Sequence, residues 1–255
     1  MRESRGPIAG GRGWGKGGGG VVPVCIESLE VRPRILYGTK MPLNLGIIPV
    51  TAFVDWNSQI HAAAPKKEAD PIEVCDATLR YLGKAIGRVL NEVDSSRRYD
   101  VTLRVYHGWY KGFEPSARRK AMVQVFAGTD FPALSNKANV VIRPELYFGD
   151  FLASALPRRL HARLNIHLPN TLRRDPNDKT EIEEKMVDSA IASEVVDLAH
   201  REPDRWLVVV GDDDDLVPPI FVAEGARPAE GGKVLLLRTR SETPFLKLDG
   251  VSVKP

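Results

Sequence analysis

The sequence predicts an α/β fold, a three-layer sandwich with helices on both faces of a mainly parallel sheet. Three observations favour this class. Short apolar runs alternate along the chain with longer segments whose apolar residues recur every three or four positions. The short runs are apolar and β-branched, as are strands buried on both faces of a parallel sheet. The chain has 255 residues, of which 43% are hydrophobic, so it can bury one sizeable core.

The first expected strand covers residues 47–55 (IIPVTAFVD), which are apolar and rich in β-branched residues. A helix is expected from Asp70 to Val93, where apolar residues recur at three- and four-residue steps. The remaining expected elements are strands at 101–107, 140–142, 163–168, 205–210 and 233–239, and helices at 114–126, 181–200 and 218–224. Strands that alternate with helices in this way pair in parallel through right-handed crossovers.

One main domain with appendages is expected. Residues 1–20 are rich in glycine and arginine and almost free of apolar residues, which predicts a flexible tail. Prolines interrupt residues 21–46, which we expect to form an irregular extension. The main domain is expected at 47–225 with an insertion around 128–178, followed by a C-terminal strand and tail at 226–255.

Composition excludes several classes of protein. The formal net charge of +3 argues against a strongly basic nucleic-acid coat, so contacts with a polyanion have to come from local basic clusters. Cys25 and Cys75 lie far apart and predict neither a disulfide framework nor a zinc site, which favours a reducing compartment. The sequence has no apolar run of about 20 residues and no secretory signal pattern. We therefore expect a soluble, cytoplasmic protein without membrane contact.

Acidic residues follow two of the expected strands. Asp55 ends the first strand, and four consecutive aspartates, Asp212 to Asp215, come directly after the apolar run that ends at Val210. A charged strand end is a common surface feature, but the carboxyl ends of parallel strands meet at one edge of a sheet. A solvated acidic turn is the simpler alternative for the four aspartates. The apolar segments on both sides of them argue instead that they are held at the sheet edge.

Asp188 is the third acidic candidate. It precedes Ile191 and Ala192 by three and four residues, so we expect it on the inward face of the helix at 181–200. A carboxylate in the first turns of a helix is also favoured by the helix dipole. Two interpretations stay open, namely a helix-start acid packed near a backbone amide and a metal ligand that points into a site.

Together these acids predict a cation site. Two unit charges about 4 Å apart interact by about 4 kcal/mol at an effective dielectric constant of about 20. Asp55, Asp188 and the acidic run therefore need protonation or a bound cation in order to lie close together. Hard carboxylate oxygens favour Mg²⁺ or Mn²⁺ over zinc.

Two short motifs surround these acids. The first consists of Glu184, Lys185, Val187 and Asp188, and the second of Gly211, Asp212, Asp213, Asp214, Asp215, Leu216, Val217 and Pro218. The segment that contains them resembles the second half of an NYN domain, a branch of the PIN-like nucleases, whose motifs read E-K-x-V-D and approximately S-G-D-x-D-F-V-P. Asp55 and Asn57 match the family's first motif, although its aspartate and asparagine are more often three residues apart. Asp212 stands where the family usually has glycine.

The resemblance covers 47–225 and implies a metal-dependent nuclease, an endoribonuclease that hydrolyses RNA phosphodiesters with Mg²⁺ or Mn²⁺. It assigns Asp213 and Asp215 to the two metal-binding positions of the second motif. With Asp55 and Asp188 they would hold the metal, directly or through water, and Asn57 would orient a phosphate or a water. Further candidates are Asp212, Asp214 and Lys185.

Basic clusters are candidates for contacts with the nucleic-acid backbone, although paired charges are usually a solvated surface. The clusters consist of Arg118, Arg119, Lys120, Arg158, Arg159, Arg173 and Arg174. Trp109 and Tyr110 either stack on bases or belong to the core. The histidines His107, His161 and His167 have no metal-ligand spacing and are expected to be structural or surface residues.

Other functions stay open. A PIN-like domain that has lost activity would be an RNA-binding or scaffold module, and it would bind RNA without cutting it. A phosphatase of the haloacid-dehalogenase type needs a second aspartate where Asn57 stands, and a Toprim-type site needs a glutamate in place of Asp55. The residues do not decide between RNA and DNA, and a protein partner or a homo-oligomer also stays open.

Overall fold

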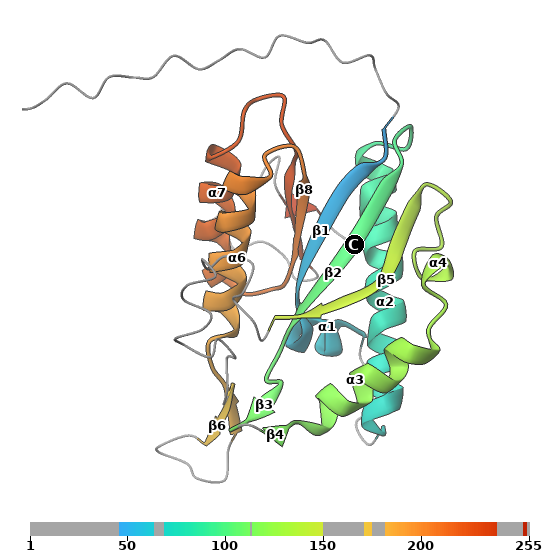
Figure 1. The fold of residues 1–255 in the computed structure, drawn as a ribbon, viewed down its shortest axis with the longest axis vertical. Coiled ribbons are helices and arrows are strands. Elements are labelled where there is room, and N and C mark those ends of the chain that lie inside the picture. Colours follow the sequence, from blue (N-terminus) through green and yellow to red (C-terminus); the bar gives the residue numbers. More distant parts are fainter. Residues whose placement is uncertain are drawn as a thin grey trace, which may run out of the picture. The chain divides into compact units, whose positions relative to one another are not determined.

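The computed structural model describes residues 46–63, 69–112, 114–149, 171–174, 182–238 and 252–253 (Figure 1). The expected tail at 1–20, nearly all of the extension at 21–46 and the expected strand at 163–168 lie outside these residues. The described residues belong to one compact unit that begins at Leu43. Its α/β architecture is the one expected from the sequence.

The central sheet has six strands in the order β10-β9-β8-β1-β2-β5. The strands are β1 (Ile48–Asp55), β2 (Tyr99–Tyr106), β5 (Val140–Phe148), β8 (Trp206–Val210), β9 (Val234–Leu237) and β10 (Ser252–Val253). All neighbouring pairs are parallel. Asp55 lies opposite Tyr106, and Val54 lies opposite Val210. The carboxyl ends of β1, β2 and β8 are therefore level with one another.

Helices cover both faces of the sheet (Figure 1). One face carries α1 (Trp56–Ala63), α2 (Pro71–Val93), α3 (Ala117–Gly128) and α4 (Phe131–Leu134), and the other carries α6 (Val187–Arg201) and α7 (Val217–Gly225). The strand β1 alternates between the two apolar clusters: Ala52 and Val54 pack on the α2 side, and Phe53 packs on the α6 side. Burial on both faces explains why β1 and β8 are apolar at nearly every position.

The expected helix at 181–200 begins later than its sequence suggests. Residues Ile182–Glu184 form strand β7, which pairs in antiparallel fashion with β6 (Leu172–Arg174). Met186 then adopts a left-handed conformation with φ of 71°, and the helix starts only after it. The hairpin pairing takes these residues out of the helix, a tertiary effect that local helical spacing does not contain.

The expected helix at 114–126 also begins later, at Ala117. Glu114–Pro115 form strand β4, which pairs with β3 (Tyr110–Lys111). Ser116 is the N-cap, because its Oγ accepts a hydrogen bond of 3.2 Å from the backbone N–H of Arg119. The cap fixes the point at which the extended chain turns into α3.

Three further elements differ from the expected pattern. The helix α1 was not expected, and it follows β1 without a loop. Strand β5 extends beyond the expected 140–142 to Phe148, and it belongs to the central sheet although it lies in the segment expected as an insertion. The expected helices at 70–93 and 218–224 and the expected strands at 101–107, 205–210 and 233–239 are confirmed to within three residues at either end.

No helix in the described ranges is long and apolar enough to cross a membrane.

The packing of α2 on α4 gives a stability test at Gly87. An added Cβ would collide with the backbone carbonyl of Ser135. We expect Gly87→Ala to lower the free energy of unfolding by about 1–3 kcal/mol, because overpacking outweighs the helix-propensity gain of about 1 kcal/mol. Chemical denaturation measures the change. The matched control is Gly128→Ala in α3, whose Cβ meets nothing within 4 Å and which should be neutral or slightly stabilising. Equal effects of the two substitutions would contradict this packing.

Candidate functional site

The parallel sheet brings four polar side chains to one edge, where β1, β2, β8 and β9 end. These residues are Asp55, His107, Asp212 and Arg238. A pocket of about 320 Å³ lies at this edge. We call it the acidic pocket, and its lining residues are Asp55, Asn57, Ser58, His61, Asp212 and Asp213. The two strand ends that the sequence singled out, Asp55 and the acidic run, thus meet in one pocket.

Asp55 is held by the first turn of α1. Its Oδ1 accepts hydrogen bonds from the backbone N–H groups of Asn57 at 3.1 Å and Ser58 at 3.5 Å. The Oγ of Ser58 donates to the backbone carbonyl of Asp55 at 2.9 Å. Burial, followed by the nearby charge of Glu184, raises the pKa of Asp55 to about 6 in spite of the hydrogen bonds with Ser58. A smaller contribution in the same direction comes from Asp188.

Gly211 allows the end of β8 to approach Asp55 closely. A Cβ at this position would lie 2.7 Å from Leu216 Cδ1 and 3.3 Å from Asp55 Cβ. Leu216 is fully buried and has little room to move. A glycine at this point therefore lets the acidic run pass directly beside the end of β1.

Asp188 is the second residue of α6 and is half-buried. Burial, followed by the charges of Asp213 and Asp215, raises the pKa of this carboxyl group, and Glu184 adds to the effect. Of the stripe expected on this helix, Ile191 is buried, whereas Ala192 is only partly so. The charges of Glu184 in the first motif and of Asp213 and Asp215 in the second motif therefore act on Asp188.

The four aspartates after β8 divide into two roles. The Oδ1 of Asp213 accepts a hydrogen bond of 2.9 Å from the backbone N–H of Asp215 and caps the short helix η1 (Asp214–Leu216). Both Asp213 and Asp215 are exposed. Asp214 turns the other way, and its carboxylate accepts a hydrogen bond of 2.7 Å from Arg238 Nη2.

Arg238 anchors the acidic run to the end of β9. Its side chain is 1% exposed, and its Nη2 also donates to the backbone carbonyl of Asp212 at 3.0 Å. A buried guanidinium thus offsets one of the four negative charges and fixes the backbone of the loop. Asp213 and Asp215 are left as the members of the run that raise the pKa of Asp188.

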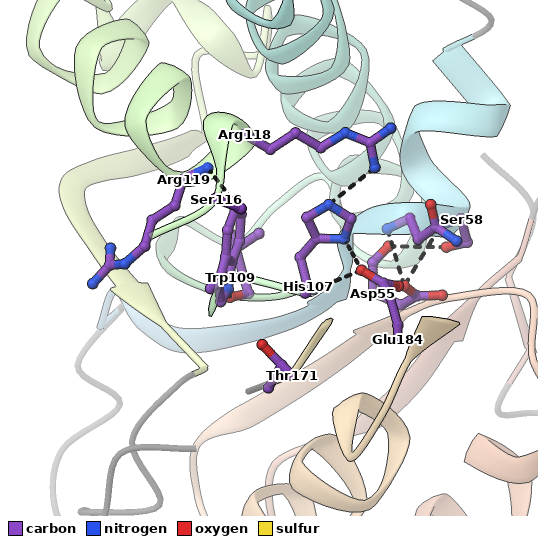
Figure 2. Close-up of polar contacts among 12 residues, drawn as sticks. Asp55, Ser58, His107, Trp109, Ser116, Arg118, Arg119, Thr171 and Glu184 are labelled. Atoms are coloured by element: carbon purple, nitrogen blue, oxygen red, sulfur yellow. Dashed lines mark hydrogen bonds and ion pairs between the residues drawn. The ribbon is translucent and has the colours of Figure 1, made fainter. Parts of the chain in front are cut away.

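A second polar network lies beside Asp55. Figure 2 shows His107 between Arg118 and Glu184, with Asp55 next to Glu184. Arg118 Nη1 is 3.0 Å from His107 Nε2, and His107 Nδ1 contacts Glu184 Oε1. A guanidinium only donates, so Nε2 has to be the acceptor and the proton of a neutral ring lies on Nδ1. We assign this tautomer, in which His107 donates to Glu184.

Glu184 remains ionised although it is partly buried. The backbone N–H of Gly108 donates to its Oε1 at 2.6 Å. Burial alone would raise the pKa of this carboxyl group, but the hydrogen bonds from His107 and Gly108 and the nearby Arg118 lower it below the usual value. The ionised Glu184 in turn raises the pKa of Asp55. Glu184 therefore acts together with Asp55, Asp188, Asp213 and Asp215, and we call these five carboxylates the acidic set.

The basic candidates occupy different environments. Arg118 and Lys120 are exposed, whereas the Arg119 guanidinium lies over the rings of Tyr110 at 4.9 Å and Phe148 at 4.1 Å. Lys185 Nζ pairs with Glu183 Oε2 at 2.6 Å. Arg173 and Arg174 lie in β6, and Arg158 and Arg159 lie outside the described residues.

Trp109 belongs to the core. Its side chain is fully buried, and its Nε1 donates to the carbonyl oxygen of Val105 at 3.0 Å. Its ring packs edge-on against His107 and Phe148. This placement overturns base stacking as a role for Trp109, because a nucleic acid cannot reach the ring face.

The acidic set has the chemistry of a site for a hard cation. Within the residues that the structure describes, no group of three or more His, Cys, Asp or Glu side chains is arranged to hold a metal ion. Mg²⁺ commonly keeps several waters and binds through one or two carboxylates together with substrate phosphates. Asp55 and Asp188, whose pKa values are raised by neighbouring carboxylates, could bind a hydrated ion of this kind. Asp213 and Asp215, whose charges act on Asp188, are the further residues that could contribute to such a site.

Sequence reasoning did not assign Glu184, His107 and Arg238 to the site. Glu184 stood in the quoted E-K-x-V-D motif, and this position was its only signal. Arg238 follows an apolar strand that ends at the same edge, and topology alone would have placed it there. His107 depends on its contacts with Arg118 and Glu184, which are 11 and 77 residues away along the chain, and no local pattern reveals them.

No protein-family model, curated protein or solved structure matches this chain.

The raised pKa of Asp55 predicts a pH-dependent difference in stability. An unperturbed aspartate has a pKa near 3.8, and the value in the fold is about 6. The contribution of this group to stability is complete below pH 3.8 and is lost as the pH rises through about 6. We expect Asp55→Asn to become more stable relative to wild type by about 2–3 kcal/mol between pH 4 and pH 7.5. Denaturation at both pH values without divalent ions measures this difference.

The amide of Asn retains the acceptor for Asn57 and Ser58, so the variant keeps the local hydrogen bonds. Asp197→Asn in α6 is the control, because Asp197 lies at the surface in an ion pair with Arg201. If the free energies of unfolding of Asp55→Asn and wild type changed with pH in the same way, the pKa of Asp55 would not be raised in the fold.

Proposed function

We propose that this protein is a metal-dependent nuclease of the PIN-like class, most directly an endoribonuclease that hydrolyses RNA phosphodiesters with Mg²⁺ or Mn²⁺. One observation carries the proposal. At the carboxyl edge of a parallel sheet, Asp55 and Asp188 have raised pKa values because burial is combined with the charges of neighbouring carboxylates. Carboxyl groups with pKa values shifted by burial and by neighbouring charges cluster at functional sites, so this arrangement supports a functional site.

Asp55, Asp188, Asp213 and Asp215 are the proposed metal-holding residues. A bound divalent ion would lower the pKa of a coordinated water and offset negative charge on the phosphoryl oxygens. Asp55 comes from β1, Asp188 from α6, and the other two from the loop after β8. Three segments, namely the end of β1, the start of α6 and the loop after β8, would therefore contribute to the proposed metal site.

Asn57 and Glu184 have supporting roles in this proposal. Asn57 lines the acidic pocket, and its side chain would orient a phosphate or the attacking water. Glu184 is fixed by His107 and Gly108 and keeps a negative charge beside Asp55. We assign Glu184 as a positioning residue that favours cation binding at Asp55.

The choice of RNA and the PIN-like class follow from the resemblance of the two acidic motifs to the NYN pattern. A cytoplasmic location belongs to the same proposal and agrees with Cys75, which is a free, buried thiol.

A second candidate is an RNA-binding or scaffold module of the same class without activity. The observation that favours it is that no described group of three or more ligand side chains is arranged to hold a metal ion. Such a module would bind RNA and leave it intact.

Cleavage of labelled single-stranded RNA and DNA tests the proposal. Wild type should cut RNA with Mn²⁺ or Mg²⁺ and should not cut in EDTA. Asp188→Asn and Asp213→Asn should each lower the rate by about 100-fold or more, because each removes charge from the metal site. Asparagine is as good an N-cap as aspartate, so Asp213→Asn keeps η1 in place.

Asp197→Asn serves as the control on α6, and circular dichroism confirms that each variant is folded. Equal cleavage rates in wild type and the three variants would show that Asp188 and Asp213 take no part in the reaction. RNA binding without cutting under every metal condition would favour the scaffold module.

A further inference from the structure

A second pocket adjoins the acidic pocket and is larger. It has a volume of about 490 Å³, and we call it the side pocket. Its lining residues are Asn57, His107, Gly108, Ser116, Ala117, Arg118, Leu172 and Glu184. They come from α1, the end of β2, the start of α3 and the β6–β7 hairpin. We propose that the side pocket binds the nucleotide next to the cleaved bond, with the phosphate of that nucleotide on Arg118. This assignment rests on the proposed function.

The position of the side pocket supports this role. Asn57 lines both pockets, so they share a wall at the first turn of α1. Glu184 lines the side pocket and acts electrostatically on Asp55, which lines the acidic pocket. A polynucleotide whose reacting phosphate lies at Asp55 can therefore place its neighbouring unit in the side pocket.

Arg118 forms no direct ion pair with a carboxylate in the described part of the chain, although its charge acts on Glu184. Seven other arginines do form an ion pair with an acid. Those seven are Arg80, Arg97, Arg104, Arg143, Arg201, Arg205 and Arg238. Arg118 is instead fixed by the buried His107, which accepts one of its N–H groups and leaves its charge in place. A fixed guanidinium with donors to spare suits a phosphate.

The apolar part of the lining suits the uncharged part of a nucleotide. The side chain of Leu172 lies directly over Gly108, where an added Cβ would collide with it. Ala117 adds a small apolar surface at the first turn of α3. With about 490 Å³, the side pocket falls in the range of about 300–1,000 Å³ that is usual for small-ligand sites and exceeds what a lone phosphate needs. The side pocket thus has the cation Arg118, an apolar part at Leu172 and Ala117, and the carboxylate of Glu184, which also acts on Asp55. The cation and the apolar part fit a phosphate with its sugar and base.

Binding of a mononucleotide tests this inference independently of cleavage. The full chain in EDTA is titrated with uridine 5′-monophosphate, and separately with inorganic phosphate and with uridine, by calorimetry. We expect saturable binding of the monophosphate, at least tenfold tighter than binding of inorganic phosphate or uridine. A uridine oligonucleotide that competes with the monophosphate shows that the flanking unit of a strand uses the same pocket.

Two substitutions at one position separate the pocket from the fold. Ala117→Glu adds a carboxylate to the wall of the side pocket, and at the first position of α3 an acid is compatible with the helix dipole. We expect it to weaken monophosphate binding about tenfold or more, whereas the neutral Ala117→Gln changes binding less than about threefold. Arg118→Gln should weaken binding to a similar extent as Ala117→Glu, and Arg80→Gln on α2 should leave it unchanged.

The outcomes distinguish the side-pocket assignment from the proposed nuclease function. No saturable binding of the monophosphate, or equal binding by Ala117→Glu and Ala117→Gln, would overturn the side-pocket assignment while metal-dependent cutting could still be observed. Equal affinity for inorganic phosphate and the monophosphate would overturn the assignment of the apolar part of the lining to a sugar and base. Specific binding in a protein that never cuts RNA would contradict the proposed function and leave the side pocket as a nucleotide site.

Discussion

Like charges held together at the edge of a parallel sheet are the constraint on which the rest of the structure depends. The strands of the central sheet are parallel, and β1, β2 and β8 end level with one another. Asp55 and the acidic run therefore meet whatever their mutual repulsion, and α6 adds Asp188 from the neighbouring layer. The apolar clusters on both faces supply the free energy that keeps these carboxylates in place.

The chain offsets part of this charge with fixed groups and leaves the rest. Arg238 pairs with Asp214 from a buried position on β9, and His107 with Gly108 stabilises the ionised Glu184. Neither Arg238 nor His107 pairs with Asp55 or Asp188, and the pKa values of these two aspartates are raised. A site that were only structural would gain from pairing these acids as well. Their remaining negative charge would attract a divalent cation, and in the proposed function that cation would bind the phosphodiester.

Much of the sheet could be predicted from the sequence, because apolar strands and amphipathic helices are local patterns. The same patterns predicted Asp55 and the acidic run at one edge. The start of α6 was misplaced because the β6–β7 pairing competes with helix formation, and Trp109 could not be assigned to core or surface from its neighbours. The contacts of His107 with Arg118 and Glu184, and of Arg238 with Asp214, join distant segments, and spacing along one sequence does not contain them.

Direct binding of Mn²⁺ to the full chain tests the central claim, which is that the acidic set holds a divalent cation. Calorimetric titration at pH 7.5 should show one or two saturable sites for which Mg²⁺ competes. Affinity should fall about tenfold or more in Asp188→Asn and remain unchanged in Asp197→Asn. Absence of saturable Mn²⁺ binding to the wild type, or the same affinity in Asp188→Asn, would contradict the account.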